Sequence, residues 1–296
     1  RGRIMNQVRF QRDWMILRHY AAQKGVKLFG DLPIFVAKDS VDVWVRPHLF
    51  HHDVVAGVPP DYFSEDGQRW GTMLYNWEAH REDDWTWWRM RMSRICGLFD
   101  LVRIDHFRGF DSAWAIPVEE STAKNGRWME GPGDELLQAI SDVSGDTLIV
   151  AEDLGIIPEN VIELRKRHNL PGMSVLHFGF DDENEDNPHR PENIPRDCIV
   201  YTGTHDNDTT MGWWEKAPSE RKLRVIESGL AGENACTTLI RLAMESQSPL
   251  AIVPLQDILQ LDSDARMNTP GKSTGNWAWR FDWPELINGN WNAFKR

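Results

Sequence analysis

Six short apolar runs, separated by stretches with helical periodicity, constrain the fold of this chain more than any other feature. The runs cover 26–29, 98–104, 147–151, 174–180, 198–202 and 250–254. Before and between them, apolar residues recur every three or four positions, as at Phe10, Trp14 and Leu17, which predicts amphipathic helices. Because strands that alternate with helices form right-handed βαβ units, the sequence predicts an α/β fold with a parallel sheet.

Acidic residues stand at the ends of four of these predicted strands: Asp31, Asp105, Glu152 and Asp206. Polar groups at strand carboxyl ends build the active sites of (β/α)8 barrels, and open doubly wound sheets bind ligands at the same edge. No Gly-rich nucleotide fingerprint follows any of the strands. Six strands are two fewer than a closed barrel needs. We therefore expect residues 1–296 to form an incomplete (β/α)8 TIM barrel of about six C-terminal βα units, with the first two units upstream of Arg1.

The segment Val102–Phe110 places an acid, a histidine and an arginine directly after a buried strand. Side chains alternate along a strand, so Arg103 and Asp105 should point to the same side. A guanidinium beside a carboxylate holds that carboxylate ionised near neutral pH. An ionised, oriented Asp suits a covalent nucleophile, although a purely structural Arg–Asp pair explains this segment equally well.

Composition narrows the class of partner and the compartment. The net charge of −12 argues against a nucleic-acid partner and against an anionic membrane surface. Three scattered cysteines suit a reducing compartment, and no apolar run is long enough for a membrane span, so we expect a cytoplasmic protein. The 15 tryptophans mildly favour a carbohydrate ligand, because aromatic faces stack on sugar C–H groups, but any single Trp is better explained as core.

Nine motifs resemble those of the 4-alpha-glucanotransferases (amylomaltases or disproportionating enzymes), a branch of the alpha-amylase clan. Three of them end strands: Val102–Phe110, Val150–Gly155 and Tyr201–Thr210. The other six are Gly30–Ala37, Val58–Ser64, Gly126–Trp128, Gly131–Gly133, Pro254–Asp257 and Ala265–Gly271. The resemblance covers nearly the whole chain. It implies transfer of alpha-1,4-glucan segments between donor and acceptor sugars derived from starch or glycogen, without metal or organic cofactor.

The resemblance also implies three catalytic acids. Asp105 would be the nucleophile, Glu152 the general acid and base, and Asp206 a third carboxylate that grips sugar hydroxyls and favours ring distortion. In a retaining enzyme the two reacting carboxyl groups lie roughly 5–5.5 Å apart. Neighbouring strands about 4.8 Å apart can supply that spacing.

Ten further residues are implied as substrate-binding groups. Arg103 would orient Asp105, His106 and His205 would bind sugar hydroxyls, and Asp31 would lie near the same subsite. A loop insertion over about 44–75 would arch over the groove and contribute aromatic and amide side chains: Tyr62, Phe63, Gln68 and Trp70. A loop over about 255–280 would contribute Gln256 and Asn268.

Two alternatives remain open beside glucan transfer. A metal-dependent TIM-barrel hydrolase could use Asp105, His106, His205 and Asp206 as ligands. A catalytically inactive glucan-binding fragment would retain the fold without turnover. The acidic stretch 181–192 has offsets of a calcium loop, but Asp186 stands where the sharp turn needs Gly, so a solvated acidic loop explains it better.

Overall fold

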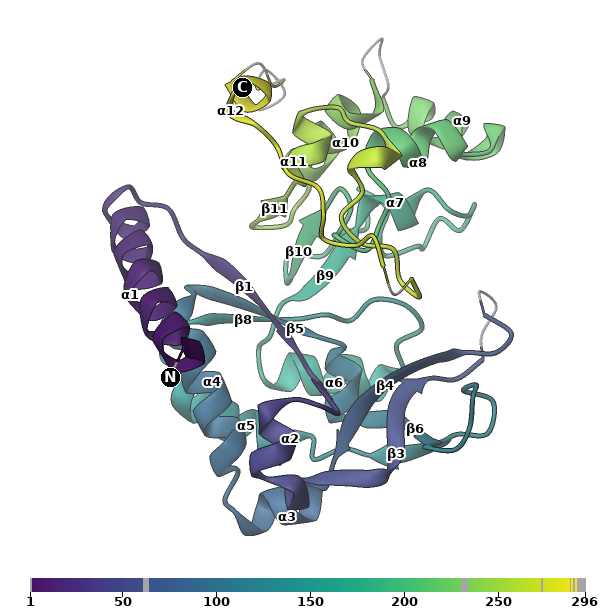
Figure 1. Cartoon of the computed structure of the whole chain (residues 1–296). Helices are drawn as coiled ribbons and strands as arrows, with labels where there is room; N and C mark the ends of the chain where they lie inside the picture. Colours follow the sequence, from purple (N-terminus) through teal and green to yellow (C-terminus); the bar gives the residue numbers. More distant parts are fainter. Residues whose placement is uncertain are drawn as a thin grey trace. The chain divides into compact units, whose positions relative to one another are not determined.

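Two three-stranded parallel sheets and one five-stranded antiparallel sheet make up the β structure of the residues that the structure describes (Figure 1). The computed structural model describes residues 2–60, 64–229, 234–272, 274–287, 289 and 291. The chain divides into two compact units, unit 1 over Arg1–Pro171 and unit 2 over Gly172–Arg296.

The parallel sheet of unit 1 has the strand order β1-β5-β8. Its strands are β1 (Phe29–Pro33), β5 (Leu101–Asp105) and β8 (Leu148–Ala151). Asp31 lies opposite Arg103 in the β1–β5 pair, and Ile104 lies opposite Ala151 in the β5–β8 pair. This register brings Asp105 and Glu152 to the same edge, because each directly follows one member of that last pair.

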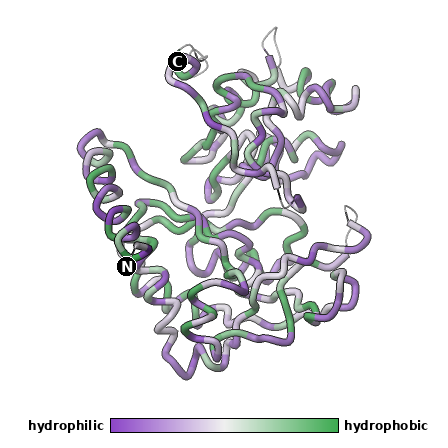
Figure 2. Tube along the Cα trace, viewed as in Figure 1, coloured by the Kyte–Doolittle hydropathy of each residue, from purple (hydrophilic) through white to green (hydrophobic). Residues whose placement is uncertain are grey.

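Helices precede, connect and follow these strands. They are α1 (Gly2–Gln23), α3 (Trp77–Glu82), α4 (Thr86–Leu98), α5 (Asp134–Ser144) and α6 (Glu159–Arg167). A short helical turn, η2 (Phe107–Phe110), follows β5. Helix α4 packs on α5 and on β1 and β5, and Figure 1 shows α4 and α5 side by side. Only Ala21 of α1 is buried, and Figure 2 shows hydrophobic and hydrophilic residues mixed along that helix.

The antiparallel sheet lies where the sequence predicts a loop over about 44–75. After α2 (Val41–Val45), the structure instead forms η1 (Pro47–Leu49), β3 (Phe50–Val58) and β4 (Gln68–Tyr75). Strand β7 (Arg127–Glu130) joins the same sheet. With β2 (Val36–Ala37) and β6 (Ser112–Pro117) they give the order β2-β4-β3-β6-β7.

Aromatic side chains fill the core of unit 1 beneath this sheet. Trp88 and Phe110 are completely buried, and Tyr75 is 1% exposed. The ring of Trp88 lies 5.2 Å from that of Tyr75 and 5.4 Å from that of Phe110. The Tyr75 hydroxyl donates to the Ile34 carbonyl over 2.5 Å, which satisfies its polar end. For these residues, packing explains the aromatic content of the sequence.

Unit 2 contains the second parallel sheet, with the order β11-β10-β9. Its strands are β9 (Gly172–Val175), β10 (Cys198–Tyr201) and β11 (Ala251–Ile252). The expected strand over 174–180 is therefore wrong in its second half, which forms α7 (Leu176–Gly179). The other helices are α8 (Thr210–Lys216), α9 (Ser219–Glu227), α10 (Ala235–Glu245), α11 (Leu255–Ile258), η3 (Ser263–Ala265) and α12 (Trp283–Ile287).

The mixed α/β class is as predicted, and five of the six predicted strands overlap a parallel strand by two residues or more. The expected buried strand over 26–29 is wrong except at Phe29, because β1 begins there and runs to Pro33, and Val26 is 53% exposed. In the part of the chain that the structure describes, these strands form two separate sheets that are not closed into a barrel. Within the same residues, no helix combines the length and apolarity needed to cross a bilayer.

Candidate active site

Three side chains from β1 and β5 form an ionic cluster at one edge of the unit 1 sheet. Arg103 donates from Nη1 to Asp31 Oδ2 over 2.5 Å and from Nη2 to Asp105 Oδ1 over 2.6 Å. The Arg103 side chain is 9% exposed, whereas both carboxylates are 42% exposed. The buried guanidinium therefore holds two carboxylates toward solvent, and Arg103 and Asp105 share a face as strand alternation predicts.

The Glu152 carboxyl group is held by backbone N–H groups at the end of the neighbouring strand. His106 N donates to Glu152 Oε2 over 2.8 Å, and Leu154 N donates to Oε1 over 3.1 Å. The backbone pairs as well, since Glu152 N donates to the Ile104 carbonyl over 3.0 Å and Phe107 N to the Glu152 carbonyl over 3.1 Å. These bonds fix the acid directly against the residue that follows Asp105.

Burial raises the pKa of Glu152 to about 7 from an ordinary 4.5. The Arg103 charge and the two backbone N–H groups oppose this shift, and the negative charge of Asp105 adds to it. A carboxyl group with this pKa still carries a proton near neutrality. It can act first as a general acid and then, once deprotonated, as a general base.

His106 connects the acids to an aromatic surface. Its φ of +51° lies in the left-handed region, where strained residues cluster at functional sites. Its ring meets that of Trp70 edge to face at 4.8 Å, and the Phe35 ring lies 6.2 Å away. Burial lowers the pKa of His106 to about 4, so the ring is neutral at pH 7 and can exchange hydrogen bonds with hydroxyl groups. Trp70 Nε1 donates to Gln68 Oε1 over 3.1 Å, which brings both predicted residues to this surface.

A second cluster forms in unit 2 after β10. Asn268 Nδ2 donates to Asp206 Oδ1 over 2.6 Å, and His205 Nε2 lies 3.5 Å from Asp206 Oδ2. Arg266 donates from Nη2 to the Asp206 carbonyl over 2.6 Å and from Nε to the Asn268 carbonyl over 2.7 Å. The loop containing Asn268 is therefore attached to the segment that contains the predicted third carboxylate.

Gln256 lies behind this cluster. Gln256 is 7% exposed and donates from Nε2 to the Ala265 carbonyl over 3.1 Å. This buried hydrogen bond stabilises the start of the loop that contains Asn268. The adjacent Asp257 accepts hydrogen bonds from the hydroxyls of Thr202 and Thr210, each over 2.7 Å. These bonds anchor the start of α11 to the end of β10 and to α8.

The chain matches the family model of glycoside hydrolase family 77, 4-alpha-glucanotransferase, over residues 3–285. It belongs to this family. It is 48% identical over 285 residues to the chloroplastic/amyloplastic 4-alpha-glucanotransferase of Solanum tuberosum, covering 94% of this chain and 49% of the relative. It is also 48% identical over 286 residues to the 4-alpha-glucanotransferase of Thermus thermophilus, covering 92% of this chain and 57% of the relative.

A solved structure of a family member agrees with the fold. The amylomaltase from Streptococcus agalactiae in complex with acarbose superposes with a TM-score of 0.90 at 39% identity, covering 94% of this chain and 58% of that chain. This glucanotransferase-family chain thus spans about half the length of the curated relatives it matches.

The structure gathers the predicted site residues of this family member into two groups. Asp31, Gln68, Trp70, Arg103, Asp105, His106 and Glu152 belong to unit 1, and His205, Asp206, Gln256 and Asn268 belong to unit 2. Tyr62 and Phe63 lie outside the described residues. Among the described residues, no three His, Cys, Asp or Glu side chains are grouped as metal ligands, and Asp105 is engaged by Arg103 instead.

Sequence reasoning missed three residues at these clusters: Phe35, Arg266 and Trp277. Phe35 and Arg266 stand inside motifs quoted for the family resemblance, but nothing in their local spacing gives them a role. Trp277 lies outside every motif, and its ring is 5.2 Å from that of His205. The signals that pointed toward it were its place in the predicted loop over about 255–280 and the high tryptophan content of the chain.

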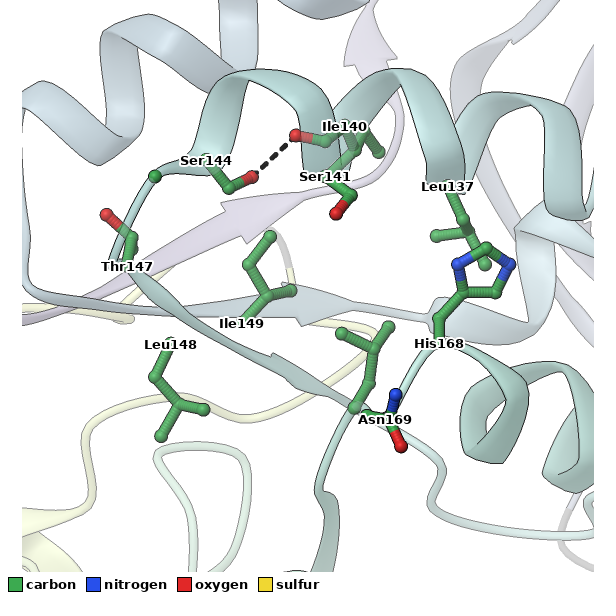
Figure 3. A pocket seen from close by; sticks show the side chains of 11 residues that line it. Leu137, Ile140, Ser141, Ser144, Thr147, Leu148, Ile149, His168 and Asn169 are labelled. Carbon is green, nitrogen blue, oxygen red and sulfur yellow. Dashed lines mark hydrogen bonds between the residues drawn. The ribbon is translucent and has the colours of Figure 1, made fainter.

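A cavity of about 180 Å³ lies elsewhere in unit 1, between the C-terminal half of α5, the start of β8 and the residues after α6 (Figure 3). Leu137, Ile140, Leu148, Ile149 and His168 are among its lining residues. Glu152 follows the carboxyl end of β8, whereas this cavity lies at the amino end. It is therefore separate from the candidate active site.

Proposed function

We propose that the protein is a retaining 4-alpha-glucanotransferase, which moves alpha-1,4-glucan segments from donor to acceptor sugars through a covalent glycosyl-enzyme. The observation that supports this most is the arrangement at the ends of β5 and β8. An arginine-paired Asp105 stands beside a Glu152 whose pKa is about 7. One ionised and one protonated carboxyl group on adjacent strands are the pair that retaining glycosyl transfer needs.

In the first half-reaction Asp105 Oδ2 attacks the anomeric carbon of the donor, since Oδ1 accepts the hydrogen bond from Arg103. The C1–O4 bond breaks as Glu152 gives its proton to the departing oxygen. The products are a glycosyl ester on Asp105, an ionised Glu152 and a shortened glucan with a free 4-hydroxyl.

In the second half-reaction Glu152 takes the proton from the 4-hydroxyl of an acceptor sugar. The acceptor oxygen attacks C1, and Asp105 leaves as a carboxylate. Asp206 is the third carboxylate of the proposal. It binds sugar hydroxyls and favours a distorted ring, and its attachment to Asn268 and to Arg266 supports a fixed orientation.

The proposal extends to the architecture and the remaining binding residues. The six parallel strands belong to an incomplete (β/α)8 barrel, and Asp31, Tyr62, Phe63, Gln68, Trp70, Arg103, His106, His205, Gln256 and Asn268 serve substrate binding. Three scattered cysteines, at positions 96, 198 and 236, support a reducing, cytoplasmic setting. The partners are alpha-1,4-glucan donors and acceptors.

Incubation of the whole protein with maltotriose tests the proposal. Transfer yields glucose plus a ladder of longer maltooligosaccharides, whereas hydrolysis yields glucose and maltose alone. Asp105→Asn should abolish the ladder and leave the melting curve nearly unchanged. Asp53→Asn serves as the matched control, because its side chain is 77% exposed on β3. Acarbose, which is bound in the Streptococcus agalactiae amylomaltase, should also inhibit this protein. An active Asp105→Asn variant would refute the nucleophile assignment.

A further inference from the structure

Trp277 is held in an unusual position in unit 2. Its φ of +59° lies in the left-handed region that non-glycine residues rarely adopt. The residue is 53% exposed, and its ring centroid lies 5.2 Å from that of His205 with the planes inclined by 42°. A large aromatic side chain that is neither in the core nor relaxed in its backbone calls for an explanation other than packing.

The surrounding loop fixes this conformation. Trp277 N donates to the Met267 carbonyl over 2.7 Å, which ties it to the segment before Asn268. Arg280 Nη1 donates to the Trp277 carbonyl over 3.0 Å. Asn276 Oδ1 accepts from Thr269 N over 3.0 Å, so the preceding residue is tied to the same segment. Hydrogen bonds on both sides of Trp277 therefore offset the cost of the left-handed backbone and keep the indole beside His205.

The groups around the indole match the chemistry of a pyranose ring. A glucose unit presents apolar C–H groups on its faces and hydroxyls around its edge. Here an exposed aromatic surface adjoins an imidazole at His205, a carboxylate at Asp206 and an amide at Asn268. The indole can cover a face of the sugar while the three polar side chains bind its edge.

Unit 1 contains a similar pair of residues. Trp70 is 38% exposed, and its ring contacts that of His106, the residue that follows Asp105. In each unit, an exposed tryptophan therefore lies against a histidine that neighbours a proposed catalytic acid.

We propose that Trp277 is a sugar-stacking residue, which binds the face of a glucosyl unit whose hydroxyls contact His205 and Asp206. This inference rests on the proposed function, because it assigns the indole to the same glucan substrate. It adds a specificity-determining residue to the site, since stacking selects a pyranose over an acyclic polyol with similar hydroxyls.

Binding of maltoheptaose to the whole protein in a Glu152→Gln background, measured by isothermal titration calorimetry, tests the proposal. Trp277→Gly removes the ring and relieves the backbone, because Gly populates positive φ readily. We expect it to weaken maltoheptaose binding about tenfold, which corresponds to about 1.4 kcal/mol. Trp277→Phe keeps an aromatic face and should bind within about threefold of the background protein, by the same scale. Trp283→Ala is the matched control, because Trp283 is 70% exposed and packs against Phe281 instead.

Two further measurements separate the outcomes. Trp277→Asn, which also tolerates the left-handed backbone, repeats the test if the Gly variant unfolds at a lower temperature. Unchanged maltoheptaose binding in a folded Gly or Asn variant would overturn the inference, as would equal losses in the Phe and Gly variants. If the wild-type protein forms no ladder from maltotriose while the stacking variants still lose binding, the proposed function fails and the role of Trp277 in glucan binding stands.

Discussion

The pKa of Glu152 should set the alkaline limit of glucan transfer. Burial raises this pKa to about 7 from 4.5, a difference of about 2.5 that corresponds to about 3 kcal/mol in favour of the protonated carboxyl group. Because only the protonated form can donate to the departing oxygen, kcat/KM should fall about tenfold for each pH unit above about 7. An exposed glutamic acid would lose its proton near pH 4.5 and would place the alkaline limit of transfer far lower.

Removing the neighbouring charge should move the pKa in a known direction. Asp105 is a negative charge that raises the pKa of Glu152. Asp105→Asn should therefore lower it, and a carboxyl-selective readout such as difference infrared spectroscopy can follow this in the inactive variant. A wild-type pH profile that stays flat to pH 9, or a variant pKa above that of the wild type, would refute this reasoning.

The same shift links stability to pH. The native carboxyl group keeps its proton up to about pH 7, whereas the unfolded chain releases it near 4.5. The native state thus binds more protons in this window, and the free energy of unfolding should fall as pH rises through it, by up to about 3 kcal/mol. Urea unfolding of the wild-type protein and Glu152→Gln at pH 5 and pH 8 measures this difference directly. If the free energy of unfolding depended on pH equally in the two proteins, the raised pKa of Glu152 would be refuted.

Three other perturbations follow from single contacts. Arg266→Met removes the link between the carbonyls of Asp206 and Asn268, so kcat for transfer should fall about 10- to 100-fold with little change in melting temperature. Trp88→Ala empties a completely buried site and should cost about 3–5 kcal/mol in urea unfolding. Burial lowers the pKa of His80 to about 4 from 6.5, so native stability should decrease as pH falls through that range, and His80→Phe should reduce this acid sensitivity.

Much of the parallel strand framework could be predicted from the sequence, because strands such as β8 and β10 lie in apolar runs. Strand β1 was displaced from its predicted range, because it contains Gly30 and Asp31 and lies after the apolar run rather than within it. Val102 and Ile104 of β5 are completely buried, and the run that predicts the strand ends one residue before Asp105. The period of two along this strand also predicts the shared face of Arg103 and Asp105. The local sequence pattern was sufficient for this prediction, because the geometry of a single strand determines which of its side chains share a face.

The antiparallel strands could not be recognised in the same way. In β3, His52 and Asp53 are exposed in succession and Val54, Val55 and Ala56 are buried in succession, so the burial pattern lacks alternation. The pairing of β3 with β4 shifts register between Phe50 and Val55 and again before Gly57. These irregularities remove the period on which strand prediction depends.

The site residues that were missed depend on contacts between distant parts of the sequence. Arg266 donates to the carbonyl of Asp206, 60 positions away, and Trp277 reaches His205 across a similar separation. Neither contact produces a periodic pattern or a motif spacing in the nearby sequence. The positive φ values of His106 and Trp277 are also set by the folded surroundings rather than by residue type, since neither is a glycine.

The position of the acid relative to the nucleophile is determined mainly by the backbone. Glu152 Oε2 accepts from the N–H of His106, which is covalently next to Asp105, and the adjoining backbone exchanges two more hydrogen bonds with β5 and η2. Movement of Glu152 away from Asp105 would therefore require these backbone bonds to break as well. Side-chain rotation at Asp105 is restricted in turn by Arg103, which is itself largely buried and ion-paired with Asp31. In the proposed reaction one carboxyl group attacks the anomeric carbon while the other protonates the departing oxygen. The distance between the two carboxyl groups must therefore stay constant, because a misplacement of about 1 Å costs up to about 100-fold in rate.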